Sequence, residues 1–421
     1  MRLRLLPSVL SIVLLSIVLV VVLGAWRRGA AALYAARDSA SAAALASTPA
    51  DPASGERTLP GSDLALVPTI GPTPTPWPTA TPTPEPTATP LPPTPTPLLF
   101  QPAQTSVLLA GMRHEWQTWN NCGPATIAMN LSYFGSSIDQ AQAGAVLRLS
   151  ADDKNVSPYE LVAYAQQQGY ISQRLVNGST DLARTLLSNG IPVLVETWHE
   201  DGPDDGMGHY RLLVGYDDAA QTWTVYDSYD RTNLIAAEPY GGLRFSFGEM
   251  DNLWKVFNRA FVLAYPPDRA PVVDAILGAY NVTPQTMYAA AAVEAQAELT
   301  ANPADAFAWF NLGSSLTAQG QYGEAAAAFD QARAIGLPWR MFWYQFEIFE
   351  AYLALGRAQD VVTLADQVNA VTTSIEEIHY WRGRALAMLG DTAGAAQALQ
   401  QSLALNPSFA PAQQAAAELN L

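Results

Sequence analysis

The sequence predicts an α+β domain followed by an all-α repeat domain, both carried behind an N-terminal membrane helix and a stalk. Three observations support this prediction. An uncharged apolar run near the N-terminus is long enough to cross a bilayer, a Pro/Thr-rich segment follows it, and glycines recur at a near-constant interval in the Ala-rich last third. At roughly 150 residues per domain, a chain of 421 residues suits two or three units.

The apolar run covers residues 5–26 and contains no charged side chain. At about 1.5 Å per helical residue, such a run spans roughly 33 Å, which matches the hydrocarbon core of a bilayer. The apolar region of a signal peptide is usually only about 7–15 residues long. We therefore expect an uncleaved transmembrane signal-anchor, while cleavage in the following Ala-rich stretch stays open as an alternative.

The stalk covers residues 27–98, which are first Ala-rich and then Pro/Thr-rich. Between Pro68 and Pro97 there are 13 Pro and 10 Thr in 30 residues. This composition cannot build a core and favours an extended polyproline helix, which acts as a semi-rigid spacer. Because Pro/Thr stalks are typical of surfaces outside the cytoplasm, we expect a single-pass membrane protein with its globular part extracytoplasmic.

Charge and cysteine content exclude several classes of function. The formal net charge is −16, and nucleic-acid binding needs a basic face, so we expect no nucleic-acid partner. The single cysteine, Cys122, excludes an intrachain disulfide and any multi-cysteine metal site. We expect no cofactor and no metal ion. The lone thiol is either a packed core residue or a nucleophile.

The first domain is predicted over residues 99–265. Helices are expected at 121–135, 157–168 and 180–188, because each begins near a capping or Pro residue and ends near a Gly or Asn. A buried strand follows at 191–198, and strands at 210–216 and 222–228 form a hairpin around an Asp-Asp-Ala-Ala turn. Helices that precede strands in this way indicate an α+β domain.

Residues 266–284 form a Pro-containing linker in this prediction, and residues 285–421 form the repeat domain. Gly320, Gly356 and Gly390 recur at spacings of 36 and 34 residues. Residues 302–406 resemble tetratricopeptide repeats, with a degenerate second unit and an end helix at 411–421. The positions that carry the resemblance are Trp309, Leu312, Gly313, Leu316, Tyr322, Ala325, Phe329 and Ala332 in the first unit and Gly383, Ala395 and Pro407 in the third.

Cys122 opens the first predicted helix, where the helix dipole and unpaired backbone N–H groups stabilise a thiolate. Asn120 or Asn121 is expected to cap this helix, which leaves the N–H of Gly123 free to face an oxyanion. His209 begins a strand after a Gly-rich loop, so we expect it at the rim of the sheet. Folding the hairpin about residue 219 brings Asp227 within about two residues of His209. A carboxylate there can orient the imidazole toward Cys122, and the order Cys, His, Asp fits a papain-like arrangement.

These residues resemble the double-glycine leader peptidases of the papain-like clan, and most closely their stand-alone peptidase-like relatives. The motifs are Gln117, Asn121-Cys122-Gly123-Pro124-Ala125, the run from Gly208-His209 to Tyr216, and Val225-Tyr226-Asp227. The resemblance implies a papain-like fold with Cys122 as nucleophile, His209 as general base, Asp227 as orienting residue and Gln117 as oxyanion donor. Gln117 precedes Cys122 by five residues rather than the six usual in the family. Ser228 replaces the usual Pro after the aspartate, so Asp230 is an alternative orienting residue.

An acidic loop precedes His209. If it borders the cleft, it favours cationic peptide segments and raises the His209 pKa; a solvated loop without a role is the alternative. The loop residues are Glu200, Asp201, Asp204 and Asp205. His114 and His199 are expected to be solvated loop residues.

Together these features predict a membrane-anchored extracytoplasmic cysteine peptidase whose repeats recruit a peptide or protein substrate or a partner. The family's transporter modules are absent from the sequence, so a role in bacteriocin maturation does not follow. Two alternatives stay open. The first is an inactive papain-like module that binds peptides together with the repeats, which the Gln117 spacing favours. The second is a cysteine acyl transferase that forms the same acyl-enzyme.

Overall fold

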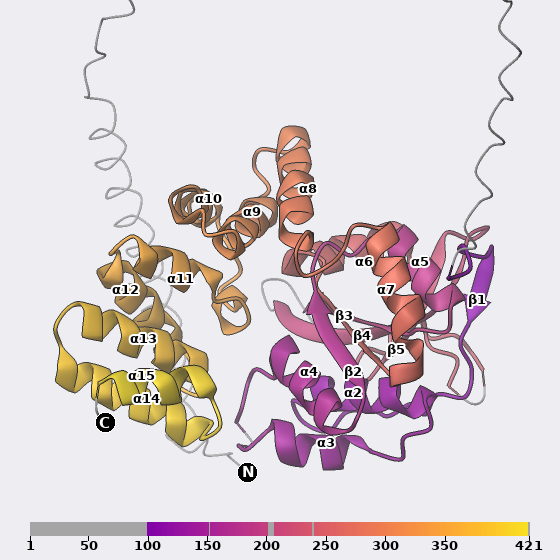
Figure 1. Cartoon of the computed structure of the whole chain (residues 1–421), viewed down its shortest axis with the longest axis horizontal. Helices are drawn as coiled ribbons and strands as arrows, with labels where there is room; N and C mark the ends of the chain where they lie inside the picture. The colour runs from indigo at the N-terminus through magenta and orange to yellow at the C-terminus, as the bar shows by residue number, and fades with distance from the viewer. Residues whose placement is uncertain (1–98, 151, 201–205, 238–239, 420–421) are drawn as a thin grey trace, which may run out of the picture. The chain divides into compact units, whose positions relative to one another are not determined.

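The computed structural model describes residues 99–150, 152–200, 206–237 and 240–419 (Figure 1). The predicted signal-anchor, the stalk, and Asp201, Asp204 and Asp205 of the acidic loop lie outside these residues. Within the described part of the chain, no helix is both long enough and apolar enough to span a membrane.

An antiparallel sheet of seven strands forms the frame of the first domain (Figure 1). Six strands lie in the order β2-β7-β3-β4-β5-β6, and β1 pairs with the end of β4. The strands are β1 (Ser106–Leu108), β2 (Ile171–Leu175), β3 (Val193–Glu200), β4 (Gly206–Asp217), β5 (Thr222–Asp227), β6 (Leu243–Ser246) and β7 (Phe261–Tyr265). The central strands β3 and β4 are buried along almost their whole length, so their side chains build the core and the site.

The pairing of β4 with β5 confirms the predicted hairpin and its register. Arg211 faces Asp227, so His209 lies two residues from the position opposite Asp227. The register shifts between Leu213 and Gly215, and β1 joins β4 at this point. Gly215 is required there, because a Cβ atom would lie 2.5 Å from the Val107 carbonyl oxygen of β1.

Helix α2 lies at the centre of the first domain and is buried from Gly123 to Leu131. Two side chains fasten it to the sheet: Thr126 donates to the Tyr210 carbonyl at 3.3 Å, and Asn130 donates to the Ala264 carbonyl at 3.1 Å. The helices of this domain are α2 (Cys122–Tyr133), α3 (Gln140–Leu147), α4 (Pro158–Gln167), α5 (Thr180–Ser188) and α6 (Phe247–Trp254). The start of α2 is therefore held rigidly against β4.

The last third is helical, and its helices pair as antiparallel neighbours (Figure 1). They are α8 (Met287–Ala301), α9 (Ala306–Ala318), α10 (Tyr322–Ile335), α11 (Glu347–Ala354), α12 (Ala358–Asn369), α13 (Glu376–Met388), α14 (Thr392–Leu405) and α15 (Ala410–Glu418). The recurring glycines 320, 356 and 390 lie in the turns between paired helices with φ of 74°, 74° and 83°. This left-handed backbone explains why the repeat keeps glycine there.

The repeats pack directly onto the first domain. Residues 266–284, predicted as a linker, contain helix α7 (Ala270–Ala279), which buries Val273, Ile276 and Leu277. Buried polar bonds also join the two domains: Asn258 donates to Ser315 at 2.9 Å, and Gln345 donates to the Val256 carbonyl at 3.0 Å. One continuous apolar core runs through both domains. The sequence did not indicate this interlocking, because none of these contacts is local.

Candidate active site

Cys122 is the first residue of α2, and no side chain caps this helix. Asn121 is the N-cap residue, as the sequence predicts, but it makes no capping hydrogen bond with its side chain. Its Nδ2 donates to the carbonyl and side-chain oxygens of Gln140, at 3.2 and 3.1 Å. Asn120 donates instead to the Asp153 carbonyl. The backbone N–H groups of Cys122 and Gly123 have no intrahelical acceptor, so they are available to an anion next to the thiol.

His209 links the thiol to a buried carboxylate. Its Nε2 lies 2.9 Å from Asp227 Oδ1, and its side chain hydrogen-bonds the Cys122 side chain. The imidazole is only 2% exposed. Burial alone would lower its pKa, but the charge of Asp227 and the hydrogen bonds to Asp227 and Cys122 raise the pKa to about 9. A protonated imidazole beside the sulfur is therefore favoured at neutral pH.

Asp227 is fully buried at the end of β5, yet its charge is well compensated. Its Oδ1 accepts the backbone N–H groups of Tyr229 and Asp230 at 2.7 and 2.8 Å, besides the bond from His209. Arg211 Nε lies 2.9 Å from Oδ2, an ion pair whose angles fall outside the hydrogen-bond range. Burial would raise the pKa of Asp227, but His209, Arg211 and the Tyr229 N–H hold it well below its usual range.

Arg211 is a site residue that the sequence analysis missed. It is 1% exposed and follows His209 by two residues on the same strand, so both side chains point to the same face. Its guanidinium donates to Thr197 Oγ1 at 2.6 Å and to His199 Nδ1 at 3.0 Å. A charged residue inside an apolar strand was the available signal. Asp230, the alternative orienting residue, lies 3.7 Å from Arg211 Nη2.

His199 is buried in β3, which corrects the prediction of a solvated loop residue, whereas His114 lies in a loop and is half-buried. His199 is 9% exposed, and its ring centre lies 5.6 Å from that of His209. His114 stacks on Tyr240 at 3.4 Å and donates from Nε2 to the Asp227 carbonyl oxygen at 2.7 Å. Burial lowers the pKa of His114, and its role is to support the turn that carries Asp227.

Gln117 and Gly123 share a cavity of about 50 Å³ with Cys122 and His209. Gln117 is fixed by two bonds: its N–H donates to the Ser228 carbonyl, and its Oε1 accepts the Ser228 hydroxyl, both at 2.8 Å. Since Oε1 is engaged, the Nε2 amino group remains a donor in the cavity. The cavity is lined by Gln117, Asn120, Cys122, Gly123, Lys154, Asn155, Val156, Glu196, Met207, Gly208, His209, Tyr210 and Tyr344.

Of the acidic loop, only Glu200 is described, at the end of β3. It is exposed, and its Oε1 accepts the Trp198 indole N–H at 3.0 Å. The raised pKa of His209 has its described causes in Asp227 and Cys122 rather than in Glu200.

Tyr344 comes from the repeat domain and lines the catalytic cavity. Its ring is so close to β4 that a Cβ atom on Gly208 would lie 3.0 Å from it. Burial and the charge of Cys122 raise its pKa above the usual range. Tyr344 and Glu196 also line a second, mostly apolar cavity of about 490 Å³ between the two domains. The other lining residues include Tyr159, Arg174, Phe257, Phe346, Glu347, Glu350, Tyr380, Trp381 and Phe409. Sequence reasoning had no signal for Tyr344, because it lies between repeat units.

Comparison with known families identifies both domains. Residues 97–260 match the Peptidase_C39 like family, and residues 306–336 and 376–409 match the tetratricopeptide repeat. The chain therefore carries a C39-like domain, related to the double-glycine leader peptidases, followed by tetratricopeptide repeats, as the sequence motifs predict. The degenerate second unit falls between the two matched repeat segments. No curated protein matches the chain.

Several solved structures are similar to parts of the chain. The peptidase domain of Streptococcus ComA, a bi-functional ABC transporter, is 14% identical with a TM-score of 0.29, and the match covers 37% of this chain and 99% of that domain. A double glycine motif protease from an AMS/PCAT transporter, solved with its leader peptide, is 17% identical over 39% and 99% of the chains, with a TM-score of 0.27. YrrB, a tetratricopeptide repeat protein with an unusual peptide-binding site, is 17% identical over 34% and 71%, with a TM-score of 0.28.

Proposed function

We propose that this protein is a cysteine peptidase that hydrolyses peptide bonds with Cys122 as nucleophile, His209 as general acid and base, and Asp227 as orienting residue. One observation carries the proposal: the buried His209 imidazole is held by Asp227 and interacts with the Cys122 thiol at an uncapped helix N-terminus. The match of residues 97–260 to the C39-like family supports the same chemistry.

The reaction follows from the charges of the site. The Cys122 thiolate attacks the peptide carbonyl carbon, and the oxyanion is stabilised by the N–H groups of Cys122 and Gly123 and by the Gln117 amide. The imidazolium of His209 gives its proton to the leaving amine, which departs and leaves an acyl-enzyme. His209 then takes a proton from water, the hydroxide attacks the thioester, and the thiolate is released with the carboxylic acid product. Asp227 holds the imidazole in the required orientation throughout.

The repeats contribute to substrate binding in this proposal. The large cavity shares Tyr344 and Glu196 with the catalytic cavity, so an extended substrate can run from one into the other. The mainly apolar and aromatic lining suits large apolar side chains, and Glu347 and Glu350 favour a neighbouring cationic residue, whereas burial raises the pKa of Glu196 to about 8. Repeat surfaces of this kind commonly bind peptides or partner proteins.

The proposal also locates this activity outside the cytoplasm. The apolar run at 5–26 is the membrane anchor, and the stalk at 27–98 holds the catalytic domain away from the lipid. A protease-protection assay on intact cells or spheroplasts tests this arrangement. We expect digestion of residues 99–421 from the outer side; full protection until the membrane is lysed would contradict it.

Thiol labelling and hydrolysis together test the catalytic proposal. In the full-length protein, iodoacetamide should label Cys122 rapidly across pH 5–9, and His209→Ala should slow the labelling at least about 10-fold. His379→Gln, a histidine of the repeats that does not line the cavity of Cys122, is the matched control and should label like wild type. A peptide library should then yield products that Cys122→Ala does not make. Rapid labelling without cleavage would favour the peptide-binding module, and ligation to an added amine would favour the acyl transferase.

Tyr344 tests the role of the repeats more sharply than a deletion, because deleting the repeats would expose the shared core. Tyr344→Ala should raise KM about 10-fold and change kcat little, since the ring lines the substrate path and does not take part in proton transfer. Trp339→Ala removes an exposed aromatic side chain five residues away and should leave both constants unchanged. An unchanged KM for Tyr344→Ala would show that the repeats do not take part in substrate binding.

A further inference from the structure

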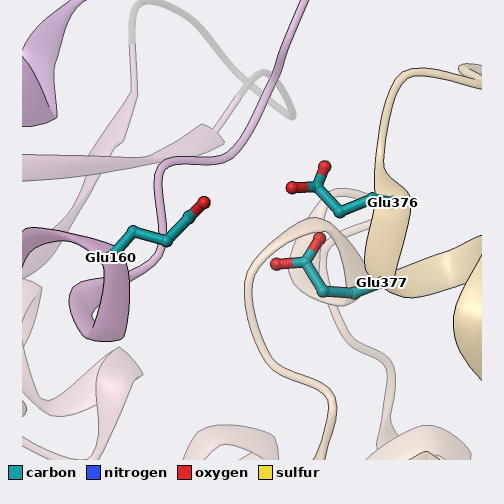
Figure 2. Close-up of side chains that lie close together, drawn as sticks. All are labelled: Glu160, Glu376 and Glu377. Carbon is teal, nitrogen blue, oxygen red and sulfur yellow. The ribbon is translucent and has the colours of Figure 1, made fainter. Parts of the chain in front are cut away.

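Three glutamates from the two domains converge at a second buried site, away from Cys122. Glu160 belongs to the first turn of α4, while Glu376 and Glu377 open α13 of the third repeat. One carboxylate oxygen from each lies within 4.8 Å of the others. Figure 2 shows the carboxylates of Glu376 and Glu377 pointing toward that of Glu160 across the domain boundary. Asp153 lies near them, because it lines the same small cavity as Glu160 and Glu376.

The hydrogen bonds of the three glutamates leave their charge unbalanced. Asn406 donates to Glu160 at 3.3 Å and to Glu376 at 2.8 Å, and Asn155 donates to Glu377 Oε1 at 3.2 Å. Glu160 Oε2 also accepts the Ser157 backbone N–H at 2.8 Å and the Ser157 hydroxyl at 3.0 Å, and all of these donors are neutral. Glu377 is 7% exposed, and its Oε2 is buried with no hydrogen-bond partner among the described residues.

No ion pair within the described part of the chain compensates the three glutamates. Burial is the main cause that raises the pKa of all three, and that of Glu160 rises to about 7. Arg148 and Lys154 lower the pKa of Asp153, but burial and Glu376 outweigh them and raise it to about 7. The N-terminus of α13 adds only about half an elementary charge. Two buried carboxylates and the half-buried carboxylate of Glu160 therefore need protons or a bound cation.

We propose that Glu160, Glu376 and Glu377 bind a calcium ion that joins α4 of the C39-like domain to α13 of the repeats. All three ligands are carboxylate oxygens, which suit a hard cation and not zinc. Oxygens bound to one Ca²⁺ at about 2.3–2.6 Å lie up to about 5 Å apart, whereas oxygens on Mg²⁺ lie at most about 4 Å apart. The three oxygens lie within 4.8 Å of one another, so a single Ca²⁺ can contact all of them.

The surroundings of the three glutamates also provide room for water ligands, a path for the ion to enter and a free ligand atom. A cavity of about 120 Å³ lined by Asp153, Glu160 and Glu376 has room for water ligands and a path for entry. The free Oε2 of Glu377 is a ligand atom that nothing else uses. The expectation of no metal ion from the sequence does not anticipate this site, since its ligands come from distant parts of the chain.

The ion would couple repeat docking to the shape of the catalytic cavity. Asn155 donates to Glu377 and also lines the cavity of Cys122, and the neighbouring Val156 does so too. Calcium at the cluster therefore fixes the segment between the two sites. The inference does not depend on the proposed hydrolysis, because ion binding can be measured without a substrate.

Calcium binding to the full-length protein in detergent is the test. After EDTA treatment at pH 7.5, titration with CaCl₂ should give a saturable binding heat, and 1 mM CaCl₂ should raise Tm by at least about 3 °C. MgCl₂ should raise it less. The double variant Glu376→Gln/Glu377→Gln should lose the calcium shift and be more stable than wild type in EDTA, because the repulsion is removed. Glu350→Gln, a carboxylate of the neighbouring cavity, is the matched control and should keep the shift.

Two results would overturn the inference. One is the absence of binding heat and of a Tm shift at pH 7.5, which would leave protons as the only compensation. The other is an equal calcium shift in the double variant, which would locate binding elsewhere. If the double variant does not fold, Glu377→Gln alone should weaken the calcium affinity at least about 10-fold, and an unchanged affinity would likewise overturn the proposal.

Discussion

Asp227 and the glutamate cluster are both buried carboxylate sites, but their charges are resolved in opposite ways. Around Asp227, one carboxylate meets His209, Arg211 and two backbone N–H groups, and its pKa falls. In the cluster of Glu160, Glu376 and Glu377, the described hydrogen-bond donors are all neutral, and each pKa rises. Burial raises the pKa of every carboxyl group involved; the neighbours decide the outcome.

The difference separates a self-sufficient site from one that needs a ligand. The catalytic site contains positive charges of its own, on His209 and Arg211, so Asp227 stays ionised without a ligand from solution. The glutamate cluster lies where two domains meet and depends on protons or a cation from solution. Both sites border the repeats, because Tyr344 lines one and α13 supplies the other.

Removing the charge of Asp227 should have the largest effect. Asp227→Asn should lower kcat/KM about 10³-fold, because the amide cannot hold and stabilise the imidazolium. The His209 pKa of about 9 is raised by Asp227, so it should fall in the variant, and the alkaline limb of the kcat/KM profile, which needs the imidazolium, should move to lower pH. Asp230→Asn is the control and should change the rate less than about 10-fold. An unmoved alkaline limb would show that Asp227 does not set the His209 charge.

Removing Arg211 should leave the buried charge of Asp227 partly uncompensated. Arg211→Met leaves Asp227 buried with part of its compensation lost, which should cost about 3–5 kcal/mol in the free energy of unfolding. The exposed pair of Arg382 and Asp366, with an N–O distance of 2.7 Å, is the matched control. Arg382→Met should cost under about 1 kcal/mol in urea unfolding, and equal costs for the two variants would contradict the comparison.

The catalytic residues could be predicted because their signals are local or follow from strand geometry. Cys122 opens a helix, and counting back from the hairpin turn locates Asp227 near His209, as the register confirms. The prediction failed where a contact depended on tertiary structure. The side chain of Asn121 bonds Gln140 instead of capping α2, and His114 packs against Tyr240.

The fold, like the catalytic site, could be predicted from the sequence where its signals are local. The hairpin, the helix order and the repeat glycines follow from periodicity and turn chemistry. Edge strands such as β1 and β6 are only three and four residues long, too short for a pattern to emerge. The docking of the repeats was not predictable, since buried pairs such as Asn258 with Ser315 join distant segments. The glutamate cluster could not be predicted for the same reason, because Glu160 lies far from Glu376 and Glu377 in the sequence.

Neutralising one carboxylate of the glutamate cluster should stabilise the protein, by less than the loss of Arg211 destabilises it. In EDTA, the folded cluster binds more protons than the unfolded chain between about pH 4.5 and 7, so its contribution to stability falls as pH rises through that window. Glu377→Gln should therefore be about 1–2 kcal/mol more stable relative to wild type at pH 7.5 than at pH 5. Urea unfolding at both pH values checks this. If the difference in stability between variant and wild type were the same at both pH values, the carboxylates of the cluster would not repel one another.

The acidic loop extends the comparison to the exposed carboxylate of Glu200 and the acidic residues that follow it in the sequence, and its effect should be the smallest. Water and salt screen such charges, so they steer ligands and scarcely change stability. Neutralising Glu200, Asp201, Asp204 and Asp205 should lower kcat/KM for cationic peptides about 3–10-fold and leave neutral peptides unchanged. The loss should shrink at about 0.5 M salt, where screening is nearly complete at these distances. If both peptide classes were cleaved as well as before, the loop would have no part in selecting substrates, and the glutamates of the large cavity would remain as the source of any preference for cationic segments.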